Sequence, residues 1–169
     1  MTDPEFGAHC LDLVENAPLD APATLGRWIA ARYPVETDAA TERDLADARM
    51  LRDAIARAAS VLSAGGVPAA SDVDVVNLVA ATPDIPPALA GGTRQAGRGR
   101  ARVGQALSEL AREAVRVLAD GERVRECAAG DCAIVFYDES RSNNRRWCSM
   151  QRCGNRAKVR AHRARGAAG

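Results

Sequence analysis

The chain has 169 residues, of which 47% are apolar and only 4% are aromatic, and its formal net charge is +1. This length suffices for one domain and a small additional module. No segment approaches the ~20 consecutive apolar residues of a membrane span. The N-terminus has neither the basic start nor the continuous apolar stretch of a secretory signal. We therefore expect a cytoplasmic protein with no membrane partner.

The small net charge conceals two segments of opposite charge. Residues 1–122 contain 12 Arg against 18 Asp and Glu, a net of −6, whereas residues 123–169 contain 11 Lys and Arg against 4 acids, a net of +7. We predict a helical domain over residues 1–122 and a separate small module over residues 123–169. A basic block of this kind favours a polyanionic partner, and docking of the two halves on each other is the alternative.

The first part is predicted to be mostly helical. One helix is expected after Asp20 as the cap, with Pro22 in its first turn, and it ends before Pro34. A second covers residues 41–62, where Thr41 and Asp44 have capping-box spacing. Its apolar positions fall on one face: Leu45, Ala48, Leu51, Ile55, Ala59 and Leu62.

Two further helices are expected on either side of a loop. Ser71 and Asp74 repeat the capping spacing, which places Val75, Leu78 and Val79 inward. The Pro- and Gly-rich residues 83–102 break the periodicity, so we predict a loop there. Its basic run from Arg94 to Arg102 is interpreted as a solvated loop, with phosphate contact as the alternative. Residues 103–120 form the last helix, with these apolar positions: Val103, Leu107, Leu110, Ala114, Val117 and Leu118.

The C-terminal module is predicted to contain two short strands and a basic helix. Residues 123–127 and 133–138 alternate as strands do, and residues 155–165 are predicted to be helical, with only Val159 and alanines available for packing. The predicted fold is thus mostly α, with a helical N-terminal domain, a small zinc-ribbon-like β-hairpin and a C-terminal basic helix.

Four cysteines in this module have the spacing of a metal site. Cys127-x4-Cys132-x15-Cys148-x4-Cys153 is typical of a structural zinc ion held by four thiolates. Two disulfides would need an oxidising compartment, and iron or an iron–sulfur cluster is the other alternative. Four cysteine ligands leave no position for a catalytic water. Cys10, far away in the sequence, is expected to be a small buried apolar residue.

Nothing in the sequence indicates catalysis. The two histidines, His9 and His162, offer few acid–base candidates, and Asp12 with Glu15 is interpreted as helix-start or surface charge. We expect no enzymatic activity. The helical domain is expected to act as a sensor or an assembly unit, which leaves open a homodimer or a small-molecule effector bound in a pocket lined by Trp28, Leu51, Ile55 and Leu110.

The segment from Arg123 to Arg165 carries a family resemblance. Its tetrapeptide Cys153-Gly154-Asn155-Arg156 and its turn D-x-S-R-x-x-x-R-R-W-C, from Asp138 to Cys148, resemble the CGNR zinc finger. The preceding region resembles the ABATE domain, through "LDLVENAP" and "LADARMLRDAI", although Glu15 replaces the usual Asn. The resemblance implies a bacterial stress-related transcription regulator with a DNA-binding zinc finger.

The basic residues of the module are the candidates for contact with nucleic acid. Arginine forks suit phosphate oxygens and guanine edges, and we expect duplex DNA in preference to RNA. For Arg156 and Arg146, the alternative to contact with nucleic acid is a structural role in bracing the cysteine turn. The rival function is a protein-interaction or dimerisation module, or an RNA-binding protein, with the finger as a scaffold. The predicted nucleic-acid residues are Arg141, Arg145, Arg146, Arg156, Lys158, Arg160 and Arg163.

Overall fold

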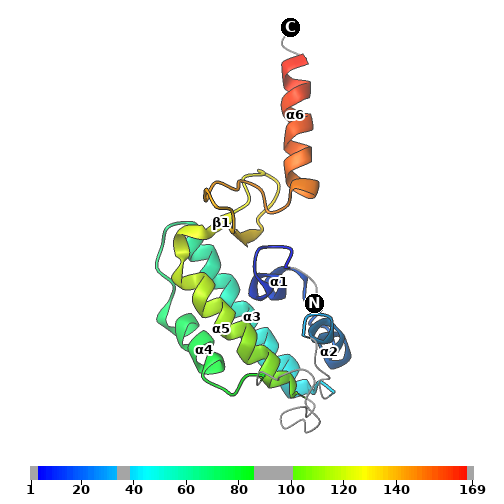
Figure 1. Ribbon diagram of the computed structural model, residues 1–169, viewed down its shortest axis with the longest axis vertical. Helices are drawn as coiled ribbons and strands as arrows, with labels where there is room; N and C mark the ends of the chain where they lie inside the picture. The colour runs from blue at the N-terminus through cyan, green and yellow to red at the C-terminus, as the bar shows by residue number, and fades with distance from the viewer. Residues whose placement is uncertain (1–3, 34–38, 86–100, 167–169) are drawn as a thin grey trace, which may run out of the picture.

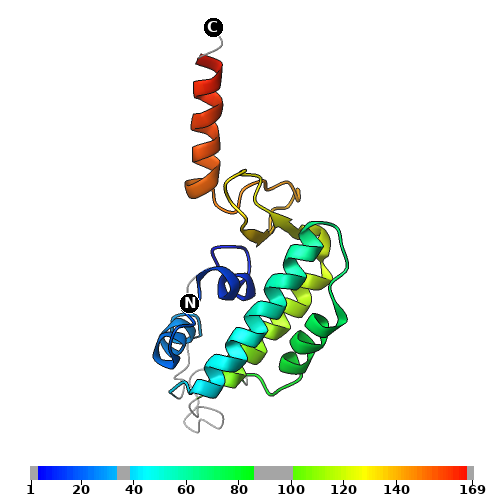
Figure 2. The ribbon, with the colours of Figure 1, turned by 180° about the vertical axis from the view of Figure 1, so that it is seen from behind.

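The structure is a computed structural model that describes residues 4–33, 39–85 and 101–166. A helical bundle forms one end, a small module with little regular structure lies in the middle, and a long helix projects from it (Figure 1). The view from behind shows the same order (Figure 2). The helices are α1 (His9–Asn16), α2 (Pro22–Ala30), α3 (Glu42–Ser63), α4 (Ala70–Ala80), α5 (Val103–Ala119) and α6 (Asn155–Gly166). The remaining elements are a 3-10 turn η1 (Gly121–Arg123), strands β1 (Val124–Glu126) and β2 (Val135–Tyr137), and a π-helical turn η2 (Met150–Gly154). The predicted mostly α fold is confirmed.

Helix α3 begins and packs as its sequence predicts. The Thr41 hydroxyl accepts the Asp44 N–H at 3.2 Å, and the Asp44 carboxylate accepts the Thr41 N–H at 2.8 Å. This reciprocal bonding satisfies two N–H groups that have no intrahelical partner. The predicted apolar face is buried except for half-buried Leu62. Helix α5 likewise buries its predicted face, with only Leu118 half-buried.

Two predicted helix starts are wrong. In α2 the cap is Ala21, one residue beyond the predicted Asp20. The Asp20 carboxylate instead accepts a hydrogen bond from the Thr24 hydroxyl at 2.7 Å. Helix α4 begins at Ala70 with no side-chain cap, rather than at the Ser71–Asp74 pair. The predicted loop over residues 83–102 falls largely outside the described residues, as do Pro34 and most of the basic run.

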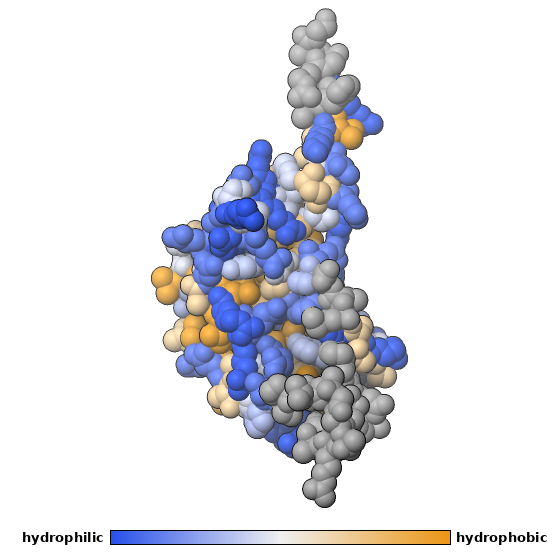
Figure 3. Space-filling view, viewed as in Figure 1, coloured by the Kyte–Doolittle hydropathy of each residue, from blue (hydrophilic) through white to orange (hydrophobic). Residues whose placement is uncertain are grey.

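Of the three residues predicted to face inward on α4, two pack half-buried against the core, and only Leu78 does not. Leu78 is 67% exposed, whereas Val76 and Asp72 are buried. The Asp72 carboxylate accepts two hydrogen bonds from Arg57 on α3, at 2.7 and 3.0 Å. This ion pair explains why the helix turns an acidic residue inward. Exposed apolar side chains gather on the bundle, while hydrophilic surface predominates around the central module (Figure 3).

The hairpin pairs its strands as predicted and joins the main core. Val124 pairs with Tyr137 and Glu126 with Val135 in an antiparallel register. Phe136, between them, is completely buried and belongs to the same hydrophobic cluster as the bundle residues. Burial of a phenylalanine at this junction fixes the module against the bundle.

Residues 4–8, which we call the N-terminal strap, connect the bundle to the module. The Asp12 carboxylate accepts N–H groups of Glu5 at 3.1 Å and of Phe6 at 3.1 Å. The Phe6 carbonyl accepts the Tyr137 N–H at 2.9 Å, so the strap contacts β2. Asp12 lies in the first turn of α1, as its helix-start interpretation predicts, but it is only 2% exposed and is therefore not a surface charge. In the described part of the chain, no helix has the length and apolar character needed to cross a membrane.

Candidate metal centre and basic surface

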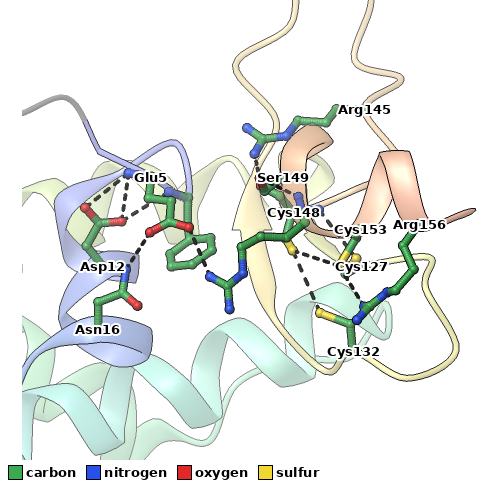
Figure 4. A network of polar contacts seen from close by, with 12 residues as sticks. Glu5, Asp12, Asn16, Cys127, Cys132, Arg145, Cys148, Ser149, Cys153 and Arg156 are labelled. Carbon is green, nitrogen blue, oxygen red and sulfur yellow. Dashed lines mark hydrogen bonds and ion pairs between the residues drawn. The ribbon is translucent and has the colours of Figure 1, made fainter.

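The four predicted cysteine ligands converge on one point. Their sulfur atoms all lie within 4.8 Å of one another, with Cys148 Sγ 3.8 Å from Cys132 Sγ and 3.7 Å from Cys153 Sγ (Figure 4). Four sulfurs bound at about 2.3 Å to a tetrahedral zinc ion lie about 3.8 Å apart. All five cysteines lie in described residues, and none forms a disulfide. The distances fit a tetrahedral metal site and exclude the two-disulfide alternative in this structure.

Two tight turns present the ligand pairs. The Cys132 N–H donates to the Ala129 carbonyl at 2.9 Å and closes the first turn, and the Cys153 N–H donates to the Ser149 carbonyl at 3.0 Å and closes the second. The Cys148 N–H points at the Cys127 sulfur, 3.4 Å away. Backbone N–H groups aimed at sulfur stabilise thiolate, the form that binds metal.

Burial and charge explain why this site needs a cation. Cys127, Cys148 and Cys153 are buried and Cys132 is half-buried. Burial, followed by the neighbouring thiols, raises the pKa of Cys148 well above its usual range. Four adjacent thiolates without a cation would repel one another strongly, whereas a divalent ion compensates their charge and releases their protons. The residues present fit one structural zinc ion.

The comparisons with known proteins identify both parts of the chain. A family model named ABATE, described as "Putative stress-induced transcription regulator", matches residues 7–121. The chain belongs to the ABATE family. The CGNR zinc finger model matches residues 123–166 and covers all four cysteines, which is consistent with one structural zinc. A search of the curated proteins gave no match. The predicted division into a helical domain over residues 1–122 and a zinc finger over residues 123–169 stays a prediction. One hydrophobic cluster contains residues of both matched regions.

The arginine of the CGNR tetrapeptide contacts a ligand sulfur. One Arg156 Nη donates to Cys153 Sγ at 3.4 Å and to the Asp131 carboxylate at 3.3 Å. Arg160, one turn later on α6, donates to the same carboxylate at 2.7 Å. Hydrogen bonding from Arg160 holds the pKa of Asp131 below its usual value. Asp131 thus connects the first cysteine turn of the zinc finger to α6.

Arg145 braces the finger from within. Its guanidinium donates to the carbonyls of Trp147 and Cys148 and lies 4.7 Å from the centre of the Phe136 ring. Bonding to backbone carbonyls, the bracing alternative expected for Arg156 and Arg146, occurs at Arg145, while Arg156 contacts a ligand sulfur. Arg146 instead lies over the ring of Trp147 at 5.1 Å. Contact of Arg145 with nucleic acid, which the sequence suggested, would compete with these internal bonds.

The other predicted nucleic-acid residues are available at the surface. Arg141, Lys158 and Arg163 are exposed, and no ion pair involves them among the described residues. Arg146 is exposed as well. The predicted set therefore divides into three groups. Arg145 braces the finger, and Arg156 and Arg160 bind Asp131. The remaining four cations are free to contact a partner. The side chain of His162 lies outside the part of the chain that the structure describes.

The predicted effector pocket is occupied by packed core side chains. Leu51, Ile55 and Leu110 have no exposed area, and Trp28 is 7% exposed. An open depression within the described residues follows the first cysteine turn, along residues 126–133. The structure therefore gives no support to a ligand pocket between these four residues of the ABATE part.

Asp138, in the turn of the zinc finger, is a fully buried carboxylate. It accepts the N–H groups of Ser140 at 2.9 Å and Arg145 at 2.8 Å, and Arg125 lies 3.8 Å away. Burial by itself raises the pKa of Asp138, but the hydrogen bonds from Ser140 and Arg145 outweigh it and hold the pKa below its usual value. The carboxylate therefore stabilises the fold above the usual aspartate pKa, and this contribution is lost as the pH falls through the lowered pKa.

We expect Asp138→Asn to destabilise the finger by about 1.5–3 kcal/mol at neutral pH, the range for hydrogen bonds to a charged group. An amide cannot accept at both of its ends. Urea unfolding at a series of pH values measures this effect, and the difference from the unsubstituted protein should shrink in acid. Glu139→Gln, at the exposed neighbouring position, is the control and should change little. Equal stability of Asp138→Asn and Glu139→Gln at neutral pH would contradict the prediction.

Proposed function

We propose that this protein is a DNA-binding transcription regulator whose zinc ion holds the CGNR finger in shape. The observation that carries the proposal is the position of α6, which projects away from the rest of the molecule (Figure 1). Its described side chains include the exposed Lys158, Arg160 and Arg163. A helix with so little apolar surface gains little from burial in protein, and its composition suits a row of phosphates.

The dimensions of α6 suit the major groove of duplex DNA. Its 12 residues span about 18 Å at 1.5 Å per residue, and the major groove is about 12 Å wide and admits one α-helix. Asp131 holds the base of α6 through Arg156 and Arg160. The free end of the helix then carries the cations that face a partner, with Arg141 and Arg146 on the turn as additional phosphate contacts.

Docking of the finger on the acidic ABATE part has a specific observation in its favour. Arg152 pairs with Glu5 of the N-terminal strap at 3.0 Å, and Phe136 lies in the shared core. These contacts use the base of the finger and leave Lys158 and Arg163 on α6 exposed. A scaffold function alone therefore accounts for the base of the finger but not for the basic helix.

Two finer points belong to the same proposal. The protein is proposed to act without catalysis. It is also proposed to act in the cytoplasm, because a site of four reduced cysteines suits a reducing compartment. RNA binding and a homodimer are the alternatives that the binding experiment addresses.

We expect wild-type protein to bind duplex DNA with an affinity that falls steeply with salt. Fluorescence polarisation with labelled duplex DNA, single-stranded DNA and duplex RNA at several salt concentrations measures it. Each phosphate contact contributes about 0.9 to the slope of log K against log salt. Lys158→Gln and Arg163→Gln should therefore each lower the slope by about one unit.

The control is Arg116→Gln, an exposed arginine on α5 of the ABATE part, which should leave the slope unchanged. Sedimentation of the same samples reports the oligomeric state. Binding that is insensitive to salt, or equal effects of Arg116→Gln and Lys158→Gln, would contradict the proposal. Tighter binding of duplex RNA than of duplex DNA would replace DNA with RNA as the partner.

A further inference from the structure

Among the residues that the structure describes, three buried polar atoms find no hydrogen-bond partner where α1 meets the C-terminal end of α2. They are Nδ1 of His9, Nε1 of Trp28 and Nε of Arg32. Trp28 is 7% exposed, and the side chains of His9 and Arg32 are 15% and 14% exposed. Folded proteins leave few buried polar groups without a partner, and each such group calls for an explanation. Three at one junction indicate that a bound molecule supplies the missing partner.

His9 and Arg32 lie beside Asp12, and Trp28 lies against Arg32. The Arg32 guanidinium lies 3.7 Å from the centre of the Trp28 ring. Asp12 Oδ2 lies 3.8 Å from Arg32 Nη2 and 3.8 Å from His9 Nδ1. Both separations exceed the hydrogen-bond range. His9 and Arg32 therefore lie beside the carboxylate without donating a hydrogen bond to it.

The internal hydrogen bonds of the group are already accounted for. Asp12 accepts the N–H groups of Glu5 and Phe6, and Arg32 Nη1 donates to the Trp28 carbonyl at 3.2 Å. The free atoms of Trp28 and Arg32 are donors and never acceptors. What is missing at this junction is therefore an acceptor. Arginine favours planar carboxylates, and the Trp28 ring offers a flat apolar wall beside it.

We propose that the junction of α1 and α2 binds a small organic carboxylate, with Arg32 Nε and Trp28 Nε1 as donors and His9 Nδ1 as the third contact. The Arg32 guanidinium, 3.8 Å from Asp12 Oδ2, offsets the repulsion between the ligand and Asp12. The site differs from the hydrophobic pocket that the sequence suggested, because it uses the polar edge of Trp28 beside Arg32 and not the core side chains Leu51, Ile55 and Leu110. It also lies beside the residue that ties the N-terminal strap to α1.

Fluorescence of Trp28 tests the site without reference to DNA. The chain has two tryptophans, so Trp147→Phe leaves Trp28 as the only one. This protein is titrated with acetate, propionate and benzoate at constant ionic strength, with benzamide as an uncharged comparison. We expect a saturable change in emission with at least one carboxylate and binding of benzamide at least about tenfold weaker, as for loss of a charged hydrogen bond.

Two substitutions in this background separate specific from general effects. Arg32→Gln should weaken carboxylate binding at least about tenfold, and Arg27→Gln, at an exposed arginine within α2, should not. Circular dichroism checks the fold, and His9→Ala replaces Arg32→Gln should the latter not fold. The proposal is overturned by the lack of a saturable response to all three carboxylates, which would indicate ordered water as the partner, or by equal weakening in Arg27→Gln.

Discussion

Replacing Cys148 with serine is expected to abolish zinc binding and to unfold the finger. Cys148 is fully buried, and its sulfur lies 3.8 and 3.7 Å from those of Cys132 and Cys153. Serine cannot supply the thiolate, and three remaining ligands leave the tetrahedron open. Structural zinc contributes about 10–16 kcal/mol of apparent binding free energy in zinc-finger peptides. Native mass spectrometry should show one zinc per unsubstituted chain and none in Cys148→Ser.

The loss should extend beyond the finger. Cys127, Cys148 and Cys153 belong to the same hydrophobic cluster as Phe6 and Phe136. We expect the α3, α4 and α5 helices to persist, because their packing is local to the bundle, while the strap and the hairpin lose protection from hydrogen exchange. A chelator should have the same effect on the unsubstituted protein.

Cys10→Ala is the matched control for zinc release. Cys10 is equally buried but does not belong to the group of four, so this variant should retain one zinc ion. A Cys148→Ser protein that still carries zinc, or a fully folded finger without metal, would contradict the assignment of the ligands.

The second large effect is expected at Gly7 in the N-terminal strap. Gly7 has φ of +81° and lies against β2, where an added Cβ would overlap the Tyr137 carbonyl oxygen. The left-handed backbone alone costs a residue with a side chain about 1–3 kcal/mol, and the overlap adds to that cost because the carbonyl is backbone. We expect Gly7→Ala to lower the free energy of unfolding by more than ~3 kcal/mol, as measured by urea denaturation.

Gly26→Ala serves as the control for glycine replacement. Gly26 lies within α2, and its added Cβ would meet Ala40 Cβ at 3.8 Å, an ordinary contact. This variant should gain about 0.5–1 kcal/mol, because glycine inside a helix is less favourable than alanine. A Gly7→Ala protein as stable as Gly26→Ala would mean that the strap does not hold the finger to the bundle.

Local chemistry determined the helices with strong patterns and the metal ligands. The capping box at Thr41 and Asp44 and the apolar faces of α3 and α5 depend on neighbours three or four residues away. The spacing of the four cysteines is likewise local within each pair, because each pair closes one tight turn. Such features are encoded over a few residues, so the sequence alone predicts them. The predicted inward face of α4 was partly wrong because the apolar residues of this helix are not confined to one face, and the Arg57–Asp72 ion pair decided its orientation.

Contacts between distant segments decided the rest. Glu5 and Arg152 are 147 residues apart in the chain, Cys10 N–H and the Glu113 carboxylate 103, and Arg160 and Asp131 29. None of these pairs has a periodic or spaced pattern that marks it in the sequence. Whether an aspartate is buried like Asp12 or exposed, and whether an arginine braces like Arg145 or remains free like Arg141, depends on which backbone N–H and C=O groups the fold brings beside it. Only the tertiary structure sets those neighbours, because a polar group is stable in the interior only where the fold supplies it with a hydrogen-bond partner.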